Sequence, residues 1–370
     1  MLGILGLLGA MFAGVLADAM MSGHHSGQDD AGDGATPDDP HNDTSGTSGT
    51  SEDGTALLDA PVPAGDPNTI ADPASDPASD PNAANDPAAG MPTSDDTPDP
   101  VDDPVALAGG KADDILTGNG GNDSVTGGAG NDLLGGRAGD DTVQGDGGND
   151  WAHGGDGNDN LAGGSGQDDL HGDDGNDSLT GGSGNDTLAG DGGNDRLASG
   201  AGADSLTGGD GADTLDAGNG ADAVQGGFGD DLAAGGQGSD TVDGNDGNDT
   251  LWGEGPSGGD DHTTDFLNGG AGNDTLHLGA GDYGNGGEGS DTFELQALHH
   301  GDPVAQITDY NPHEDALVVL YDAQHHPDPD LTVHTAKGSS DATVMLDGMP
   351  VATVQGGAGL TAADVSLRAA

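Results

Sequence analysis

Aspartate recurs at every ninth residue through the middle of the chain, and such a series of carboxylates can bind metal ions. The spacing holds without a slip through sixteen consecutive copies between Gly109 and Trp252. The sixteen aspartates are Asp114, Asp123, Asp132, Asp141, Asp150, Asp159, Asp168, Asp177, Asp186, Asp195, Asp204, Asp213, Asp222, Asp231, Asp240 and Asp249. Carboxylate oxygen is a hard ligand that suits Ca²⁺ far better than a soft metal ion. The pattern therefore predicts repeated binding of Ca²⁺.

Each aspartate occupies the sixth place of a nine-residue repeat, G-G-x-G-x-D-x-U-x, in which U is apolar. The eighth place holds a large aliphatic residue except at Ala152 and Ala233, and glycine fills the fourth place except at Ala112. Sequence repeats with a short fixed period are typical of solenoids, in which each repeat buries its apolar residue only against its neighbours.

The composition of one repeat predicts its local structure. Glycine adopts left-handed and mirror-β conformations without steric cost, so the first six residues predict a tight turn. The last three, such as Thr187–Ala189, predict a minimal strand whose aliphatic side chain points inward. Two repeats then form one coil of eighteen residues, with a turn at each edge and two thin sheets back to back. We predict an all-β solenoid, a parallel β-roll.

In such a roll, aspartates two repeats apart lie one above another at the same edge. Unit charges ~5 Å apart repel by roughly 3 kcal/mol at an effective dielectric constant of about 20. Each repeat buries one aliphatic side chain, worth ~1.5–3 kcal/mol, against an ordering cost of ~1–2 kcal/mol for each residue. Cations must therefore bridge the carboxylates. Each edge has seven gaps between its eight aspartates, which predicts up to about fourteen Ca²⁺ sites. Mg²⁺ fits less well because it demands a tight octahedron of ligands.

The repeats resemble a known family. Residues 181–189, Gly-Gly-Ser-Gly-Asn-Asp-Thr-Leu-Ala, are similar to the RTX (hemolysin-type) calcium-binding repeat, and the likeness extends over about 109–294. The resemblance implies a right-handed parallel β-roll and export by type I secretion machinery. Residues 307–310 (Ile-Thr-Asp-Tyr) and Glu314-Asp315 resemble the C-terminal region of such secreted proteins. In that family this region caps the roll and carries an uncleaved export signal.

The period breaks after Trp252. Residues 253–259 form an insertion, after which three further copies supply Asp265, Asp274 and Asp291 as additional metal ligands. The segment 278–285 is one residue short, which predicts a local distortion of the coil.

The remaining segments differ from the roll, which we place at 108–295. Residues 1–21 are apolar and predict an export signal or a membrane anchor. Residues 22–107 are rich in Asp, Pro and Ala and predict a disordered acidic linker. Residues 296–370 predict a small β-rich cap and a secretion signal. Strands are expected there at Val304–Ile307, Ala316–Leu320, Leu331–Val333, Ala342–Leu346 and Val351–Val354, with a turn at Asp347-Gly348.

Composition excludes some partners. The chain has 68 Asp and Glu residues against 5 Lys and Arg residues, a formal net charge of -63, and no cysteine. Nucleic acid and anionic membranes would be repelled, so membrane contact is expected only through residues 1–21 if they are not cleaved. The absence of cysteine is consistent with a protein that leaves the cell and needs no disulfides. We expect a secreted, extracellular protein, with tethering at the cell surface as the alternative.

The motifs of secreted enzymes are missing from the sequence. No H-E-x-x-H occurs, since His313-Glu314-Asp315 lacks the second histidine, and no G-x-S-x-G occurs in a strand-turn-helix context. Paired histidines could bind Zn²⁺ or Ni²⁺, but their spacing favours solvated loops; they lie at 24–25, 299–300 and 325–326. We expect no enzymatic activity.

Two classes of function remain. The first is a calcium-binding structural or matrix module whose roll folds in extracellular Ca²⁺. The second is an adhesin-like or polysaccharide-binding surface protein, although residues 296–370 offer only Tyr310 and Tyr321 as aromatic residues for a glycan. An accessory subunit of a secreted enzyme also remains open.

The repeats differ at the fifth place, where asparagine is usual but Ala203, Ala212 and Ala221 stand instead. Asparagine tolerates left-handed backbone better than alanine does. We predict weaker Ca²⁺ binding around Asp204–Asp222 than around Asp177–Asp195. A site-resolved NMR titration in which both groups saturate together would contradict this.

Overall fold

The computed structural model describes residues 102–256, 261–296, 301–324 and 327–370. The predicted apolar segment at 1–21 and most of the predicted linker at 22–107 lie outside these residues. The first strand begins at Ala106. Within the described ranges, no helix has the length and apolar character needed to cross a membrane.

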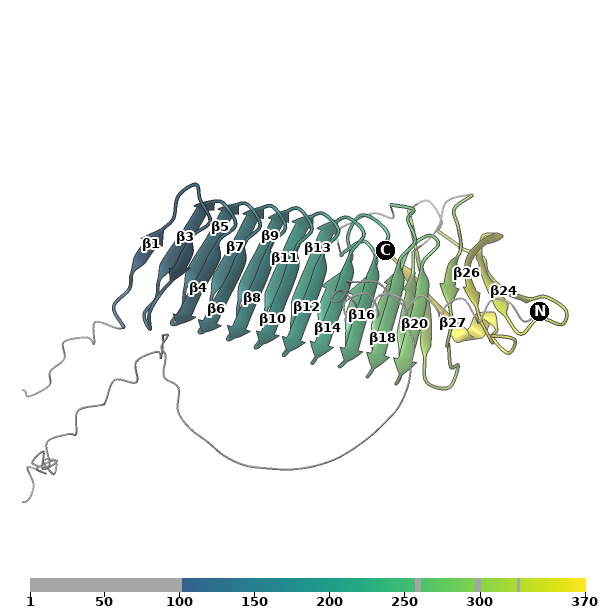
Figure 1. Cartoon of the computed structure of the whole chain (residues 1–370). Coiled ribbons are helices and arrows are strands. Elements are labelled where there is room, and N and C mark those ends of the chain that lie inside the picture. Colours follow the sequence, from purple (N-terminus) through teal and green to yellow (C-terminus); the bar gives the residue numbers. More distant parts are fainter. Residues whose placement is uncertain (1–101, 257–260, 297–300, 325–326) are drawn as a thin grey trace, which may run out of the picture. The chain divides into compact units, whose positions relative to one another are not determined.

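The chain winds back and forth between two parallel sheets (Figure 1). One sheet has 13 strands, in the spatial order β1 (Ala106–Ala108), β3 (Ser124–Ala129), β5 (Thr142–Gly147), β7 (Asn160–Ser165), β9 (Ser178–Ser183), β11 (Arg196–Ala201), β13 (Thr214–Asn219), β15 (Leu232–Ala234), β17 (Thr250–Trp252), β19 (Thr275–Leu278), β21 (Thr292–Leu295), β23 (Ala316–Tyr321) and β27 (Val365–Ala369). The other has 14 strands, in the order β2 (Ile115–Thr117), β4 (Leu133–Ala138), β6 (Trp151–Asp156), β8 (Asp169–Asp174), β10 (Thr187–Gly192), β12 (Ser205–Asp210), β14 (Ala223–Phe228), β16 (Thr241–Asp246), β18 (Phe266–Ala271), β20 (Tyr283–Glu288), β22 (Ala305–Ile307), β26 (Met349–Val354), β25 (Ala342–Leu346) and β24 (Leu331–Thr335). This alternation confirms the predicted parallel β-roll.

The strands are longer than predicted. β10 covers six residues, Thr187–Gly192, so the first three places of the next repeat also belong to the strand. Its pairing with β12 skips Gly190, the first place of that repeat, because Leu188 and Ala189 pair with Leu206 and Thr207 and the register resumes at Asp191. β10 is therefore two short paired halves around the buried Gly190, an arrangement that apolar periodicity cannot reveal.

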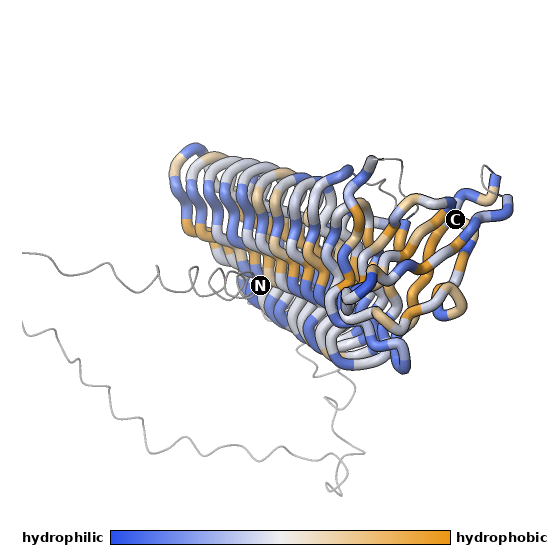
Figure 2. Tube along the Cα trace, turned by 90° about the vertical axis from the view of Figure 1, so that its right-hand side faces the viewer, coloured by the Kyte–Doolittle hydropathy of each residue, from blue (hydrophilic) through white to orange (hydrophobic). Residues whose placement is uncertain are grey.

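The core is a single row of aliphatic side chains on each sheet. Leu170, Leu188 and Leu206 pair directly in β8, β10 and β12 and are almost fully buried. Figure 2 shows hydrophobic segments recurring from coil to coil along the roll. Each aliphatic side chain contacts the one above and the one below, as the repeat predicts. At the N-terminal end of the roll the row is incomplete, because Leu116 is only half-buried.

The two breaks in the period change the length of a coil without interrupting the pairing of the strands. The insertion lengthens one coil, so that Phe266 pairs with Thr241, and the short segment shortens another, so that Tyr283 pairs with Phe266. In the short copy Gly284 takes the place of the aliphatic residue, and the side chain of Leu278 fills the space beside it. The predicted distortion is present, and both sheets continue through it.

The C-terminal residues extend both sheets and then close one of them with antiparallel strands. β23 and β27 join the first sheet, while β26, β25 and β24 form a meander on the second. The turn at Asp347-Gly348 has φ values of 53° and 77°, as a two-residue hairpin turn requires. The five predicted strands are present, and β27 was missed. Arg368 on β27 pairs with the buried carboxylate of Glu294 on β21.

The fourth place of the repeat needs glycine because of a close approach between coils. Gly184 has φ +128°, and a Cβ there would overlap the carbonyl oxygen of Gly166 in the preceding coil. We predict that Gly184→Ala lowers the free energy of unfolding by at least ~1–3 kcal/mol, the cost of backbone strain alone. Gly110→Ala is the matched control, since nothing lies within 4 Å of a Cβ at that position. Equal denaturation midpoints for the two variants would contradict the prediction.

Candidate metal sites

The repeat aspartates form two columns, one along each edge of the roll. In each column the backbone N–H of one aspartate donates to Oδ1 of the aspartate in the next coil; for example, Asp168 donates to Asp186 at 3.0 Å and Asp186 to Asp204 at 2.8 Å. The first column contains Asp114, Asp132, Asp150, Asp168, Asp186, Asp204, Asp222, Asp240, Asp265 and Asp282. The second contains Asp123, Asp141, Asp159, Asp177, Asp195, Asp213, Asp231, Asp249, Asp274, Asp291 and Asp315. All the aspartates predicted as ligands therefore stand in one column or the other.

The second oxygen of these carboxylates is buried without a partner. Sixteen Oδ2 atoms between Asp132 and Asp274 are inaccessible to solvent and have no hydrogen-bond partner within the described residues. The side chains themselves are deeply buried, with 4% exposure at Asp222 and 0% at Asp265. A buried polar group without a partner costs about 1–3 kcal/mol, and more when it is charged. A column of buried carboxylates without partners therefore needs positive charge to stabilise it.

Main-chain oxygens converge on the same places. A Cβ added to Gly181 would lie 2.5 Å from Asp186 Oδ2 and 2.8 Å from the carbonyl oxygen of Ser199 in the next coil. Gly190 has the same surroundings, with Asp195 Oδ2 and the carbonyl oxygen of Gly208. The first glycine of the repeat thus leaves room for carboxylate and carbonyl oxygen to meet. This donor set is the one that Ca²⁺ prefers, and it contains no soft ligand.

Burial makes many of these carboxylates, Asp159, Asp195 and Asp265 among them, hard to ionise in the absence of a cation. Burial, with a smaller contribution from neighbouring aspartates, raises the pKa of Asp159 to about 7 and that of Asp195 to about 6. The largest effect falls at Asp265, whose pKa rises to about 8 because of burial and the nearby charges of Asp282, Asp240 and Glu254. Protons and metal ions therefore compete for the same oxygens.

The fifth place of the repeat has a role other than the predicted one. Positive φ values fall at the second and fourth places, and the asparagines at the fifth place, such as Asn176, have none. The asparagine oxygens instead accept N–H groups of the next coil: Asn158 Oδ1 accepts from Asn176, and Asn176 Oδ1 from Asn194. An alanine such as Ala212 still donates its N–H, to Asn194, but has no oxygen to offer the next coil. The lost hydrogen bond replaces backbone strain as the reason for the weaker binding that we predict around Asp204–Asp222.

Four acidic residues near the end of the roll were missed. Asp282 and Asp315 continue the two columns at irregular spacing, and Asp309 accepts the N–H groups of Gly286 and Gly287 with its two oxygens. Glu254 lies in the insertion, close to Asp265 and Asp282. These residues do not follow the nine-residue period, so the period did not predict them. The sequence Gly-x-Gly-Asp at 279–282 resembles part of the repeat and could have indicated Asp282.

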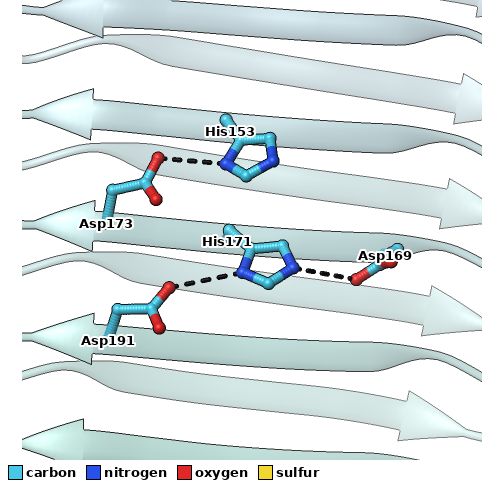
Figure 3. Close-up of polar contacts among 5 residues, drawn as sticks. All are labelled: His153, Asp169, His171, Asp173 and Asp191. Carbon is cyan, nitrogen blue, oxygen red and sulfur yellow. Dashed lines mark hydrogen bonds and ion pairs between the residues drawn. The ribbon is translucent and has the colours of Figure 1, made fainter.

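A separate cluster lies on the second sheet, away from the columns (Figure 3). His153 on β6 and His171 on β8 stack with ring centroids 4.8 Å apart. Each Nδ1 lies near a carboxylate, Asp173 at 3.0 Å and Asp191 at 3.3 Å. These half-exposed contacts join β6 to β8 and β8 to β10. The histidine pairs at 24–25, 299–300 and 325–326 lie outside the described residues.

Comparison with known families supports the assignment of the repeats. The model of the RTX calcium-binding nonapeptide repeat matches in overlapping segments through 106–255 and again at 263–293. No curated protein matches the chain significantly.

The raised pKa values predict an unusual pH dependence for the protein without metal. The unfolded pKa of aspartate is about 3.9, so between pH ~4 and ~7 the folded chain holds more protons than the unfolded chain. The resulting stability is fully present below pH ~4 and is lost as the pH rises through about 6–8. We expect chelator-treated protein to show more β-structure by circular dichroism at pH 5 than at pH 8. In saturating Ca²⁺ the trend should reverse, because protons displace the ion. More β-structure at pH 8 without metal would contradict the prediction.

Proposed function

Because residues 106–255 and 263–293 are RTX calcium-binding nonapeptide repeats, we propose that the protein is a secreted calcium-binding protein whose roll folds in extracellular Ca²⁺ and then serves as a structural or matrix module. The observation that carries this proposal is the pair of buried columns in which sixteen carboxylate oxygens have no partner among the described residues.

The chain's own residues supply every ligand that the proposal requires. Oδ2 of the column aspartates and carbonyl oxygens such as that of Ser199 would hold the ion, and the first-place glycines keep that space open. Bound Ca²⁺ would supply the positive charge that offsets repulsion within a column. The sixteen regular repeats would provide up to about fourteen such sites, and the irregular coils further ones.

Ligand binding then drives folding. Where free Ca²⁺ is scarce, the chain of net charge -63 stays unfolded, which suits passage through type I secretion machinery. Outside the cell, binding to the folded state alone stabilises it in proportion to the logarithm of the Ca²⁺ concentration. Folding is cooperative because each ion orders two coils. Residues 1–21 would serve as an export signal or tether the protein at the cell surface.

A structural role fits the described residues better than glycan binding does. Tyr310, one of two aromatic residues considered for glycan binding, is 8% exposed and packs against Phe293. It therefore does not present a sugar-binding surface. We favour the structural module over an adhesin or polysaccharide-binding protein, and we propose no enzymatic activity. A role as accessory subunit of a secreted enzyme is the second candidate.

A far-ultraviolet circular dichroism titration of the full chain tests the proposal. We expect a sigmoidal transition from unfolded chain to β-structure on addition of CaCl₂, reversed by chelator. MgCl₂ should be much less effective, since Mg²⁺ keeps its water and demands octahedral geometry. A chain without added β-structure at ~10 mM Ca²⁺, above the range of weak extracellular modules, would refute it.

A further inference from the structure

A third acidic group joins the first column where the regular repeats end. Glu254 stands just after β17, at the second place of the copy that the insertion interrupts. Asp265 and Asp282 are the last two members of that column, in the long and the short coil. One carboxylate oxygen of each of the three residues lies within 4.8 Å of the other two.

The space between these groups is kept open by a glycine. A Cβ added to Gly279 would overlap Oε1 of Glu254 and would lie 3.3 Å from Oδ2 of Asp282. Two carboxylates from different coils therefore converge on one point that carries no side chain. Asp282 is oriented there by the N–H of Gly279, which donates to its Oδ2 at 2.7 Å.

Asp265 adds an unpartnered oxygen to the same group. Its Oδ1 accepts the N–H of Asp240 at 2.9 Å, while its Oδ2 has no hydrogen-bond partner within the described residues. The side chain is 0% exposed, and Oδ2 lies where a Cβ of Gly253 would be, beside Glu254. A buried oxygen without a partner, next to two other carboxylates, needs a cation.

We propose that Glu254, Asp265 and Asp282 bind one Ca²⁺ ion more tightly than the regular repeat positions do. A step along a column offers two carboxylates, whereas this group offers three, and the number of charged ligands is a main determinant of Ca²⁺ affinity. Because of this higher affinity, the site is occupied before the others. The bound ion also links the insertion to the short coil and so stabilises the end of the regular repeats. This inference rests on the proposed function, because it ranks one site among many of the same ion.

Removal of one charge tests the ranking in the full chain. In Glu254→Gln the side chain keeps its shape but loses the third carboxylate. Glu288→Gln is the matched control, since Glu288 is an exposed glutamate at the end of β20. Calorimetric titration with Ca²⁺ should give one tight equivalent before the remaining sites for wild type and for Glu288→Gln. In Glu254→Gln that first equivalent should weaken by about tenfold or more.

Gly279→Ala provides a test at unchanged charge. A methyl group at that place should displace Glu254 from Asp282 and abolish the tight equivalent, even if Glu254→Gln fails to fold. A tight equivalent retained by Glu254→Gln or by Gly279→Ala would overturn the inference. Wild-type protein without any calcium-dependent folding would instead overturn the proposed function, so the two failures are distinguishable.

Discussion

The burial of aspartate in columns, with one oxygen bonded and the other unpartnered, is the constraint on which the rest of the structure depends. Oδ1 of Asp186 accepts the N–H of Asp168, so each carboxylate fixes the height of its neighbouring coil. Oδ2 is left facing carbonyl oxygen. Glycine at the first place leaves room for that oxygen, although Ser199 and Ala217 stand there in two copies, and glycine at the fourth place allows the close approach of the coils. Hydrophobic burial contributes only one aliphatic side chain per repeat, so the columns decide whether the roll is stable.

The regular part of this arrangement was predictable because the repeat specifies it directly. A period of nine residues predicts the coil, the inward aliphatic row and the assignment of alternate aspartates to opposite edges. The features that the pattern could not predict depend on contacts between coils rather than on places within one repeat. The second half of β10, Gly190–Gly192, is glycine-rich and has no apolar signal, so this strand was predicted at half its true length. The fifth-place asparagines serve the next coil, as Asn176 does for Asn194, and no single repeat shows this. Asp282, Asp315 and Glu254 lie where the spacing is broken.

The chain has few positive charges of its own with which to balance its acidic residues. Of its 5 Lys and Arg residues, Arg368 is placed against a buried carboxylate, that of Glu294. His277 lies 3.3 Å from the same carboxylate and stacks on Trp252. The C-terminal strand β27 is thus held to the roll by an internal ion pair. Sixteen Oδ2 atoms of the columns have no hydrogen-bond partner within the described residues, which distinguishes the roll from a C-terminal cap whose buried carboxylate is balanced by protein charge.

The ladder of bonds between aspartates also bears on how such a molecule changes over evolutionary time. The insertion at 253–259 lengthens one coil, yet the N–H of Asp240 still reaches Oδ1 of Asp265 at 2.9 Å. Register is therefore restored by β18, and the later coils keep their pairing. Duplication or loss of a whole coil in the gene would likewise preserve every downstream contact, because each coil meets only its two neighbours. The length of the roll is a heritable quantity that selection can adjust one coil at a time.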